Sequence, residues 1–247
     1  MSEPAPSELD PELVHRMLEA GSEELLALVR EHAARLDPPA VRTVLRSSYV
    51  TAEVVEVLAQ ARLLSFYEVR RDLALHPRTP QILAQQLMPG LYWRDLAALG
   101  GDTRLHPRLR RAADQYLAAR LPGLAVGEKI SLARRAGPGL LAHLRHDPSP
   151  RVIAALLDNP RLTEDILAPV VHGAATPGPV LKLIAEDRRW GARTGLQVAI
   201  CRNPGTPLAT SLKLLPLLRK PELKAVGADP RLSEAVRQRA RLLLGET

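Results

Sequence analysis

Short apolar stretches at helical spacing recur along the chain, and each is followed by a polar residue, a proline and another apolar stretch. The clearest copy runs from Ala155 to Leu167, where Asn159-Pro160 separates two apolar segments and Thr163 precedes the second. Apolar residues spaced on one face predict amphipathic helices. A proline ends a helix because it pushes the preceding residue out of the α region. The pattern therefore predicts many short helices separated by proline-containing turns.

This unit is repeated. Further copies lie at residues 72–83, 199–207 and 225–236, weaker ones at 105–109 and 146–150, and residues 43–55 match 155–167 without a gap although they lack the proline. A helix pair with one apolar face cannot bury that face alone, but stacked pairs share a continuous core. The repeat predicts an all-α fold, a right-handed α-solenoid of short stacked helix pairs. The expected core residues are Leu156, Leu157, Ile166, Leu167, Leu181, Leu183, Ile184, Leu212, Leu214 and Leu215.

Hydroxyl residues follow the prolines at the places where new helices should begin. Such residues cap helices by accepting hydrogen bonds from the first free N–H groups. The predicted caps are Thr51, Thr79, Thr163, Thr206 and Ser233, with Thr176 beginning a further helix. Proline directly after threonine suits the first helical position, which predicts that place for Pro80, Pro177 and Pro207. Glu164, Asp165 and Glu234 add negative charge to a first turn, as the helix dipole prefers.

In the copies of the repeat that contain the proline, the residue before it is short and polar or is a histidine. We call this position the slot, and it suits a side chain able to bond nearby backbone. The slot residues are His76, His106, Asp147, Asn159, Asn203 and Asp229. We therefore interpret His76 and His106 as structural residues and not as ligands.

Three segments carry a resemblance to a known class: residues 159–164 (Asn-Pro-Arg-Leu-Thr-Glu), 203–207 (Asn-Pro-Gly-Thr-Pro) and 75–80 (Leu-His-Pro-Arg-Thr-Pro). They resemble the leucine-rich-repeat-variant and HEAT-like α-helical repeat proteins of bacteria, over about residues 41–244. The resemblance implies a binding scaffold. It divides the chain into an acidic helical segment at 1–40, which packs on or caps the repeat domain, and the repeat domain at 41–247. Some members carry an N-terminal iron–sulfur cysteine cluster, but Cys201 is the single cysteine here, so no cofactor is expected.

Composition agrees with helices. Hydrophobic residues make up 46% of the chain but aromatic residues only 3%, and sheets favour aromatic and β-branched side chains. We expect no sheet and roughly 60–70% helix, about twice the usual share. The start of the chain is polar, which predicts no secretory signal, and no apolar run is long enough to cross a membrane. A cytoplasmic location is expected by default.

Charge is unevenly distributed. Residues 1–64 hold 11 acidic and 6 basic residues, a net of −5, while residues 65–247 hold 28 basic and 16 acidic residues, a net of +12. With a pI of about 10.1, the basic body makes nucleic-acid binding the alternative function. Because no regular arginine or aromatic column is visible at the repeat period, such binding should be weak, sequence-independent and sensitive to salt.

The segment Asp187 to Arg193 has the composition most typical of a binding site. It combines Arg188, Arg189, Trp190 and Arg193, and arginine and tryptophan are enriched at interface hot spots. These four residues are the candidate partner-binding site. The alternative is a structural tryptophan that fills a helix junction, with solvated arginines around it. Residues 93–95 (Trp-Arg-Asp) form a weaker version of the same cluster.

Catalytic and metal-binding patterns are weak. His143 and His146, with His172, lack the carboxylate spacing of a zinc motif, so no metal is expected. Cys201 ends an apolar segment and is interpreted as a buried thiol. Residues 136–139 (Ala-Gly-Pro-Gly) lack the rest of a phosphate-binding loop. A helical-repeat DNA glycosylase would need aromatics that this chain lacks. The sequence therefore predicts a non-catalytic scaffold that binds a protein partner, and no enzyme.

Overall fold

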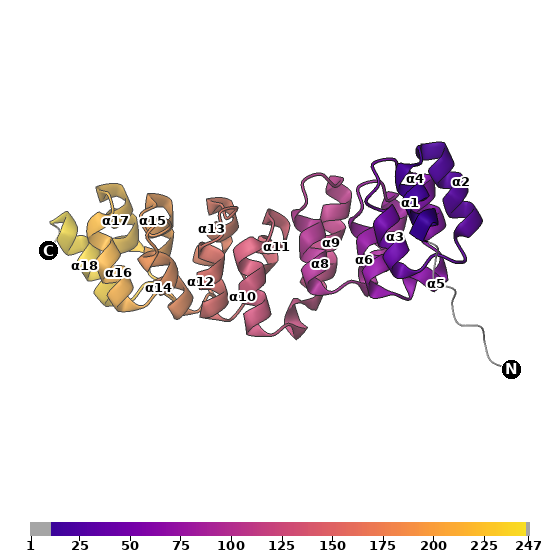
Figure 1. The fold of residues 1–247 in the computed structure, drawn as a ribbon. Helices are drawn as coiled ribbons and strands as arrows, with labels where there is room; N and C mark the ends of the chain where they lie inside the picture. Colours follow the sequence, from indigo (N-terminus) through magenta and orange to yellow (C-terminus); the bar gives the residue numbers. More distant parts are fainter. Residues whose placement is uncertain (1–10, 246–247) are drawn as a thin grey trace. The chain divides into compact units, whose positions relative to one another are not determined.

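The computed structural model describes residues 11–245, apart from the side chain of Ala61, and its regular elements are helices (Figure 1). Helices account for 70% of the structure, and no strand occurs among the described residues. Both findings confirm the predicted all-α class and helix content. The backbone contacts divide the chain into two compact units, of which unit 1 ends at Arg120 and unit 2 begins at Leu121. The predicted segments 1–40 and 41–247 stay a prediction, and residues 1–10 and 246–247 lie outside the described part.

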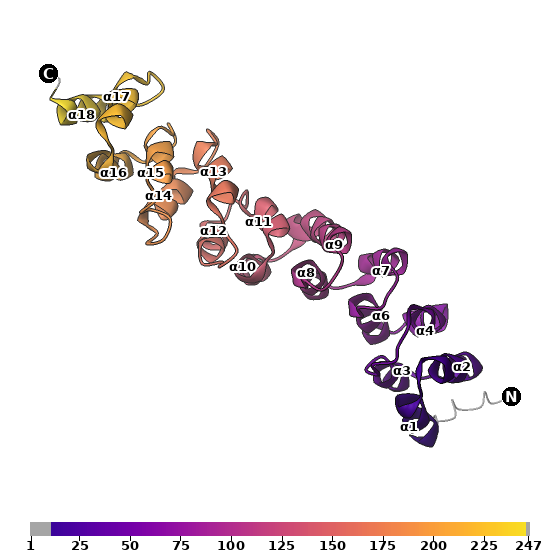
Figure 2. The same ribbon diagram turned by 90° about the horizontal axis from the view of Figure 1, so that it is seen from above.

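Unit 1 contains short helices in two rows. Seen from above (Figure 2), α1, α3, α6 and α8 form one row, and α2, α4, α7 and α9 form the other. Contacts run along the rows, from α1 to α3 to α6 and from α2 to α4, and across them, between α1 and α2, α6 and α7, and α8 and α9. The bounds are α1 (Pro11–Glu19), α2 (Ser22–His32), α3 (Pro38–Val44), α4 (Ala52–Leu58), α5 (Ala61–Leu64), α6 (Tyr67–Leu75), α7 (Gln81–Leu87), η1 (Met88–Gly90), α8 (Trp93–Gly101) and α9 (Pro107–Arg120).

Unit 2 repeats the arrangement. The helices α10, α12, α14, α16 and α18 contact one another in order, and α11 contacts α13, which contacts α15. From α10 to α14, and at α16, each helix thus packs on the helix two places along, while α10, α11, α14, α15 and α17 also pack on the next helix in the chain. The bounds are η2 (Leu121–Gly123), α10 (Val126–Arg135), α11 (Pro138–Leu144), α12 (Pro150–Leu157), α13 (Glu164–His172), α14 (Gly178–Glu186), α15 (Thr194–Cys201), α16 (Leu208–Leu214), η3 (Leu215–Leu217), α17 (Lys220–Ala228) and α18 (Glu234–Leu244).

A four-residue turn links many of these helices, and its first residue is often a slot residue identified in the sequence. At Asn159 the side-chain Oδ1 accepts a hydrogen bond from the N–H of Arg161 at 2.8 Å, and the N–H of Leu162 donates to the Asn159 carbonyl at 3.1 Å. Leu162 is thereby turned into the core. A side chain that bonds the backbone two residues on is a turn former in its own right. The same two bonds occur at Ser47, His76, Asp102, Asn203 and Asp229.

This turn confirms the structural interpretation of the residues before proline. All six of them accept a hydrogen bond from the N–H two residues later: His76, His106, Asp147, Asn159, Asn203 and Asp229. The turn at Ser47 lies where the match between 43–55 and 155–167 places it. Proline is therefore dispensable to the turn, because the side chain of the first residue fixes it.

The predicted helix caps are correct in part. Thr51 precedes α4 and accepts a bond from the N–H of Val54 at 3.4 Å. Glu164, Asp165 and Glu234 lie in first turns, as expected. Thr163 and Ser233 occupy the cap position, but neither side chain makes the capping bond.

Three other predicted caps are wrong. The hydroxyls of Thr79, Thr176 and Thr206 donate backward to the carbonyl six residues earlier, those of Leu73, Val170 and Ile200. Carbonyls in the last turn of a helix have no partner within it, so these threonines close the preceding helix and do not open the next. The prolines that follow, Pro80, Pro177 and Pro207, occupy the position just before the helix and not its first residue.

The predicted core is largely confirmed. Eight of its ten residues are buried: Leu156, Leu157, Ile166, Leu167, Leu181, Ile184, Leu214 and Leu215. Leu183 and Leu212 are half-buried instead. Leu183 precedes the buried Ile184, and neighbours on a helix point about 100° apart, so both cannot face the same core. Burial of a leucine side chain contributes about 1.5–3 kcal/mol, and stacking along the rows is the source of that burial.

Candidate functional site

The predicted partner-binding segment at 187–193 forms the junction between α14 and α15. Trp190 is fully buried, and its Nε1–H donates to the carbonyl of Leu157 at 3.1 Å. The carboxylate of Asp187 accepts bonds from the N–H groups of Arg189 and Trp190, both at 2.8 Å. The indole therefore fills the junction, which is the structural alternative, and its ring is closed to a partner.

Two of the arginines around Trp190 bond other parts of unit 2. The guanidinium groups of Arg189 and Arg193 lie 4.5 and 4.9 Å from the ring centroid. Arg189 also donates to two carbonyls of the turn after α12, at 3.2 Å each, and Arg193 pairs with Glu164 at 2.9 Å. Arg188, Arg189 and Arg193 are all exposed, and the side chain of Arg193 is 45% exposed. The four predicted residues are neighbours in the chain, and binding by this segment stays a prediction.

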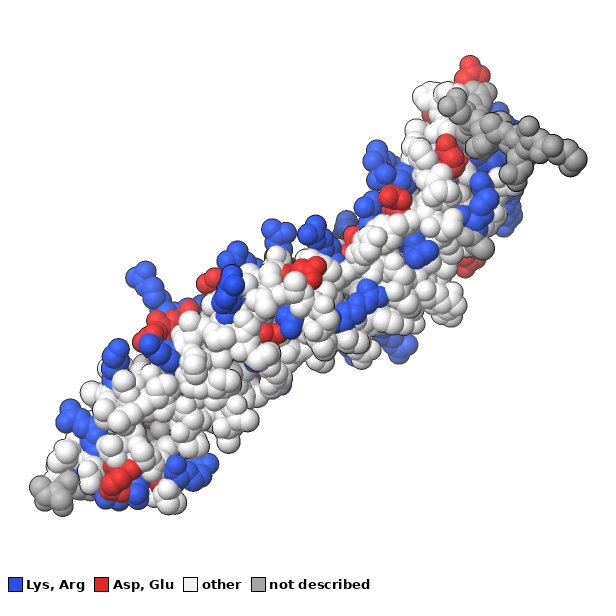
Figure 3. All heavy atoms as spheres, turned by 90° about the horizontal axis from the view of Figure 1, so that it is seen from below, with Lys and Arg blue, Asp and Glu red and all other residues white. Residues whose placement is uncertain are grey.

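Arginine in this protein frequently bonds the carbonyl groups at helix ends. Arg62 donates to Leu36 at 2.6 Å, Arg120 to Pro89 at 2.6 Å, and Arg161 to Arg135 at 3.1 Å. A guanidinium carries five N–H donors in a fixed fork, which suits clusters of carbonyls. Part of the positive charge of the protein is therefore carried by arginines that bond the backbone of the fold. On the face shown in Figure 3, red side chains and white ones lie among the blue ones.

The thiol and the histidines form no recognised reactive group. Cys201 is fully buried, as predicted, and burial raises the pKa of its thiol to about 12. His143 and His146 are exposed. In residues 11–245 there is no cluster of three or more histidine, cysteine, aspartate or glutamate side chains able to hold a metal ion.

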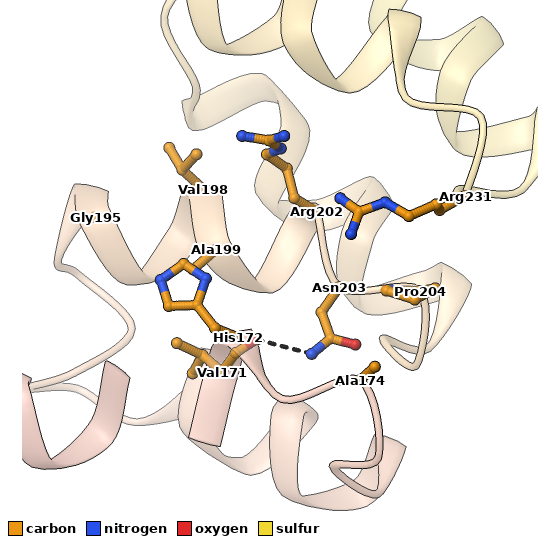
Figure 4. A pocket seen from close by; sticks show the side chains of 10 residues that line it. All are labelled: Val171, His172, Ala174, Gly195, Val198, Ala199, Arg202, Asn203, Pro204 and Arg231. Atoms are coloured by element: carbon orange, nitrogen blue, oxygen red, sulfur yellow. Dashed lines mark hydrogen bonds between the residues drawn. The ribbon is translucent and has the colours of Figure 1, made fainter. Parts of the chain in front are cut away.

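A groove in unit 2 brings together residues that the sequence analysis had not grouped (Figure 4). We call it the α13–α15 groove. Its cavity volume is about 250 Å³, and its apolar lining includes Val171, Val198 and Ala199. Polar side chains surround this lining. They are the cationic Arg202 at the end of α15 and Arg231 in the α17–α18 turn, and the imidazole of His172 at the end of α13.

Hydrogen bonds of one buried amide hold the two sides of the groove together. Asn203 is buried, and its Nδ2 donates to the carbonyls of Val171 at 2.7 Å and Gly173 at 2.9 Å, so the end of α15 is tied to the end of α13. Figure 4 shows Asn203 between His172 and Arg231, with the bond to Val171 drawn as a dashed line. Buried amides with complete hydrogen bonding fix local geometry. The opening between α13 and α15 is therefore built into the fold.

One carboxylate moderates the charge of this groove. Asp229 accepts two hydrogen bonds from Arg231, at 3.0 and 2.7 Å, and these lower the pKa of Asp229 to about 2. Arg202 lies 3.8 Å from the same carboxylate, and its side chain is 47% exposed. Asp229 is ionised at neutral pH and bonds chiefly to Arg231. The guanidinium of Arg202 therefore keeps most of its donors toward solvent.

A second groove adjoins the first, and we call it the α11–α13 groove. Its cavity volume is about 510 Å³, and Ala174 lines both grooves. Pro169, Val170 and Val180 supply apolar lining, and Arg145 and His146 supply polar groups. The Nε of Arg145 donates to the Nε2 of His146 at 3.0 Å.

The acidic residue of this second groove is neutralised within the fold. Asp147 pairs with Lys129 at 3.0 Å, and both side chains are largely buried, at 7% and 14% exposed. The positive charge of Arg145 therefore has no ionic partner in the lining of the groove. The two grooves share one character, an apolar floor with a cationic rim.

The sequence alone could not show that the residues of the grooves lie close together. They come from four separate segments, and their proximity depends on α13, α15 and two turns packing side by side. The one sequence signal was the repeated turn, since Asn203 and Asp229 both occupy the slot before proline.

Comparison of the chain with models of known families, with curated proteins and with solved structures returns no match. In the described part, no helix is long and apolar enough to cross a membrane.

Proposed function

We propose that this protein is a non-catalytic scaffold that binds another protein, and that each unit is a piece of a right-handed α-solenoid of HEAT-like or leucine-rich-repeat-variant type. The observation that carries the proposal is the pair of adjoining grooves in unit 2, with Val171 and Val198 at the floor of one and Pro169 and Val180 at the other. Concave sites with an apolar lining and a few convergent polar groups are the usual places of binding. Stacked helix pairs characteristically present such surfaces to partners.

The chemistry of the grooves supports binding and gives no support to catalysis. A nucleophile needs an activated group beside a base, and the one thiol, Cys201, is buried with its pKa raised to about 12. The histidines of the grooves lie at their rims, where His146 accepts a bond from Arg145. No cofactor is part of the proposal. The cytoplasmic location expected from the sequence also stays a prediction.

Nucleic-acid binding, the alternative function, rests on net charge. Arginines engaged with helix-end carbonyls, such as Arg62 and Arg120, still contribute to the long-range field. Directed contacts to phosphates would need free donors along one track. We therefore expect nucleic-acid binding to be weak and to fall steeply with salt.

The test is affinity capture with the full chain as bait, at about 50 mM and about 200 mM salt, followed by mass spectrometry and by reconstitution of each candidate with purified protein. We expect a partner that is retained at the higher salt. In parallel, fluorescence anisotropy measures binding to random and structured DNA and RNA at the same two salt concentrations. Tight nucleic-acid binding at the higher salt, with no reconstituted protein complex, would replace the proposal by the alternative.

A further inference from the structure

We propose that the two adjoining grooves of unit 2 bind an extended acidic peptide segment of the partner, with carboxylates on Arg202 and Arg145 and apolar side chains on the groove floors. This inference rests on the proposed function and names the chemistry of the partner. Its support from the structure has three parts, which are the uncompensated charge, the apolar floor and the continuity of the two grooves.

The first part is charge. In the α13–α15 groove, Arg202 and Arg231 face the single carboxylate of Asp229, which leaves a net positive charge. In the α11–α13 groove, Lys129 neutralises Asp147 and leaves Arg145 uncompensated. Guanidinium groups bind carboxylates with two parallel hydrogen bonds, which adds both energy and orientation. Each groove therefore favours one carboxylate.

Arg202 is the strongest of these anchors. It is 47% exposed, and its contact with Asp229 at 3.8 Å is too long for a hydrogen bond. A ligand carboxylate can therefore bind Arg202 without breaking a bond of the free protein. Arg231 already bonds Asp229 through two of its nitrogens, so it acts on a ligand carboxylate mainly through electrostatic attraction at a distance.

The second and third parts concern shape. Val198 in the first groove and Pro169 in the second are accessible, while Val171 and Val180 are buried, so each floor offers a small apolar surface. Ala174 lines both grooves, so one chain can run from the first groove to the second across the turn that contains it. Successive side chains of an extended peptide point to opposite sides. A segment with acidic and apolar residues in alternation can therefore place one kind on the rims and the other on the floors.

The same observations disfavour a nucleic acid as the occupant. Single strands bind by stacking bases on aromatic side chains along a positively charged groove. Neither groove is lined by phenylalanine, tyrosine or tryptophan, and each carries little net charge. A peptide with spaced carboxylates matches two separated cations better than a continuous polyanion does.

The test uses fluorescence anisotropy with the full chain and a short labelled peptide of alternating Glu and Leu residues. Peptides with Gln or Lys in place of Glu are the controls for charge. We expect saturable binding of the acidic peptide alone, weakened about tenfold or more by Arg202→Glu. The matched variant is Arg239→Glu, which makes the same charge change at an exposed position of α18 that lines neither groove, and it should stay within about twofold of the wild type. Circular dichroism verifies that both variants are folded.

A second variant tests shape without changing charge. Ala174 is exposed and lines both grooves, so Ala174→Phe should obstruct both and also weaken the acidic peptide about tenfold. Equal losses in Arg202→Glu and Arg239→Glu, or equal binding of the Gln peptide, would overturn the inference. An oligonucleotide that competes with the peptide and depends on Arg202 in the same way would also overturn it, in favour of a nucleic-acid groove.

The two proposals fail separately. If the partner captured by the full chain still binds Arg202→Glu and Ala174→Phe normally, the scaffold function stands and the groove assignment is wrong. If the acidic peptide binds as described but no protein complex can be reconstituted, the groove chemistry stands and the scaffold function is wrong.

Discussion

Replacing Asn159 with alanine should destabilise unit 2 by about 3 kcal/mol. Asn159 is fully buried. Its Nδ2 donates to the carbonyls of Ala133 at 2.7 Å and Ala136 at 3.2 Å, and its Oδ1 accepts from the N–H of Arg161 at 2.8 Å. The residue thus forms the turn after α12 and also ties it to the end of α10.

The magnitude follows from the groups left behind. Each of the three hydrogen bonds contributes about 1 kcal/mol, and a buried polar group left without a partner costs about 1–3 kcal/mol. The carbonyl of Ala133 lies in the last turn of α10, where helix carbonyls have no partner within the helix. Since the truncation removes all three bonds and leaves their former partners without the amide, a total near 3 kcal/mol is expected. For a unit of this size, that lowers the melting temperature by about 12 °C.

The assay is urea unfolding followed by tryptophan fluorescence in a Trp93→Phe background. In that background Trp190, buried in unit 2, is the one remaining indole and reports on that unit. Asn203→Ala should cost a similar amount, because Asn203 makes three equivalent bonds. Asp102→Ala is the contrast. It removes a turn bond and an ion pair with the exposed Arg104, worth about 1 kcal/mol together, and is measured in the chain that keeps Trp93, an indole of unit 1.

A further variant separates the donor from the acceptor. Asn159→Asp keeps the oxygen that forms the turn but turns a second oxygen toward the carbonyls of Ala133 and Ala136. Burial and these carbonyls disfavour the ionised form, so the pKa of the new carboxyl rises above its usual 3.9 or so. The folded state then holds its proton to higher pH than the unfolded state does. The stability of this variant relative to wild type should therefore fall as the pH rises above about 4. If Asn159→Ala costs no more than Asp102→Ala, the tie to α10 contributes nothing and the reasoning is refuted.

Three other outcomes are expected. Thr51→Ala should cost about 1 kcal/mol of unfolding free energy because it removes a capping bond, whereas Thr163→Ala should cost clearly less because its side chain makes none; similar losses in thermal melts would contradict this difference. Cys201 should fail to react with a thiol reagent at pH 8 until the protein unfolds, because burial raises the pKa of the thiol to about 12; rapid labelling of the native protein would show that the site opens. Arg231 lowers the pKa of Asp229 to about 2, so the ion pair of Asp229 with Arg231 stabilises the folded protein above about pH 4, and this stabilisation is lost as the pH falls toward 2. The stability difference between wild type and Asp229→Asn should therefore shrink between pH 6 and about pH 2.5 in urea titrations, and a constant difference would refute the ionic origin.

Local patterns in the sequence determined the helical class and the turns. Short apolar segments broken by proline predicted an all-α fold, and the polar slot before proline predicted side chains that bond nearby backbone, as His76 and Asn159 do. These features depend on residues within one or two turns of each other in the chain. They can be worked out without knowing which helices pack together.

Tertiary structure decided the roles of residues whose partners are distant or compete with one another. Thr79 can cap the next helix or close the previous one, and it takes the free carbonyl of Leu73. Trp190 can be an interface residue or a core residue, and the carbonyl of Leu157, 33 positions away, receives its N–H in the core. The cationic rim of Arg202 and Arg145 exists only because successive turns of unit 2 are stacked beside each other. Such outcomes depend on the free energy of packing between segments far apart in the chain, which no local pattern contains.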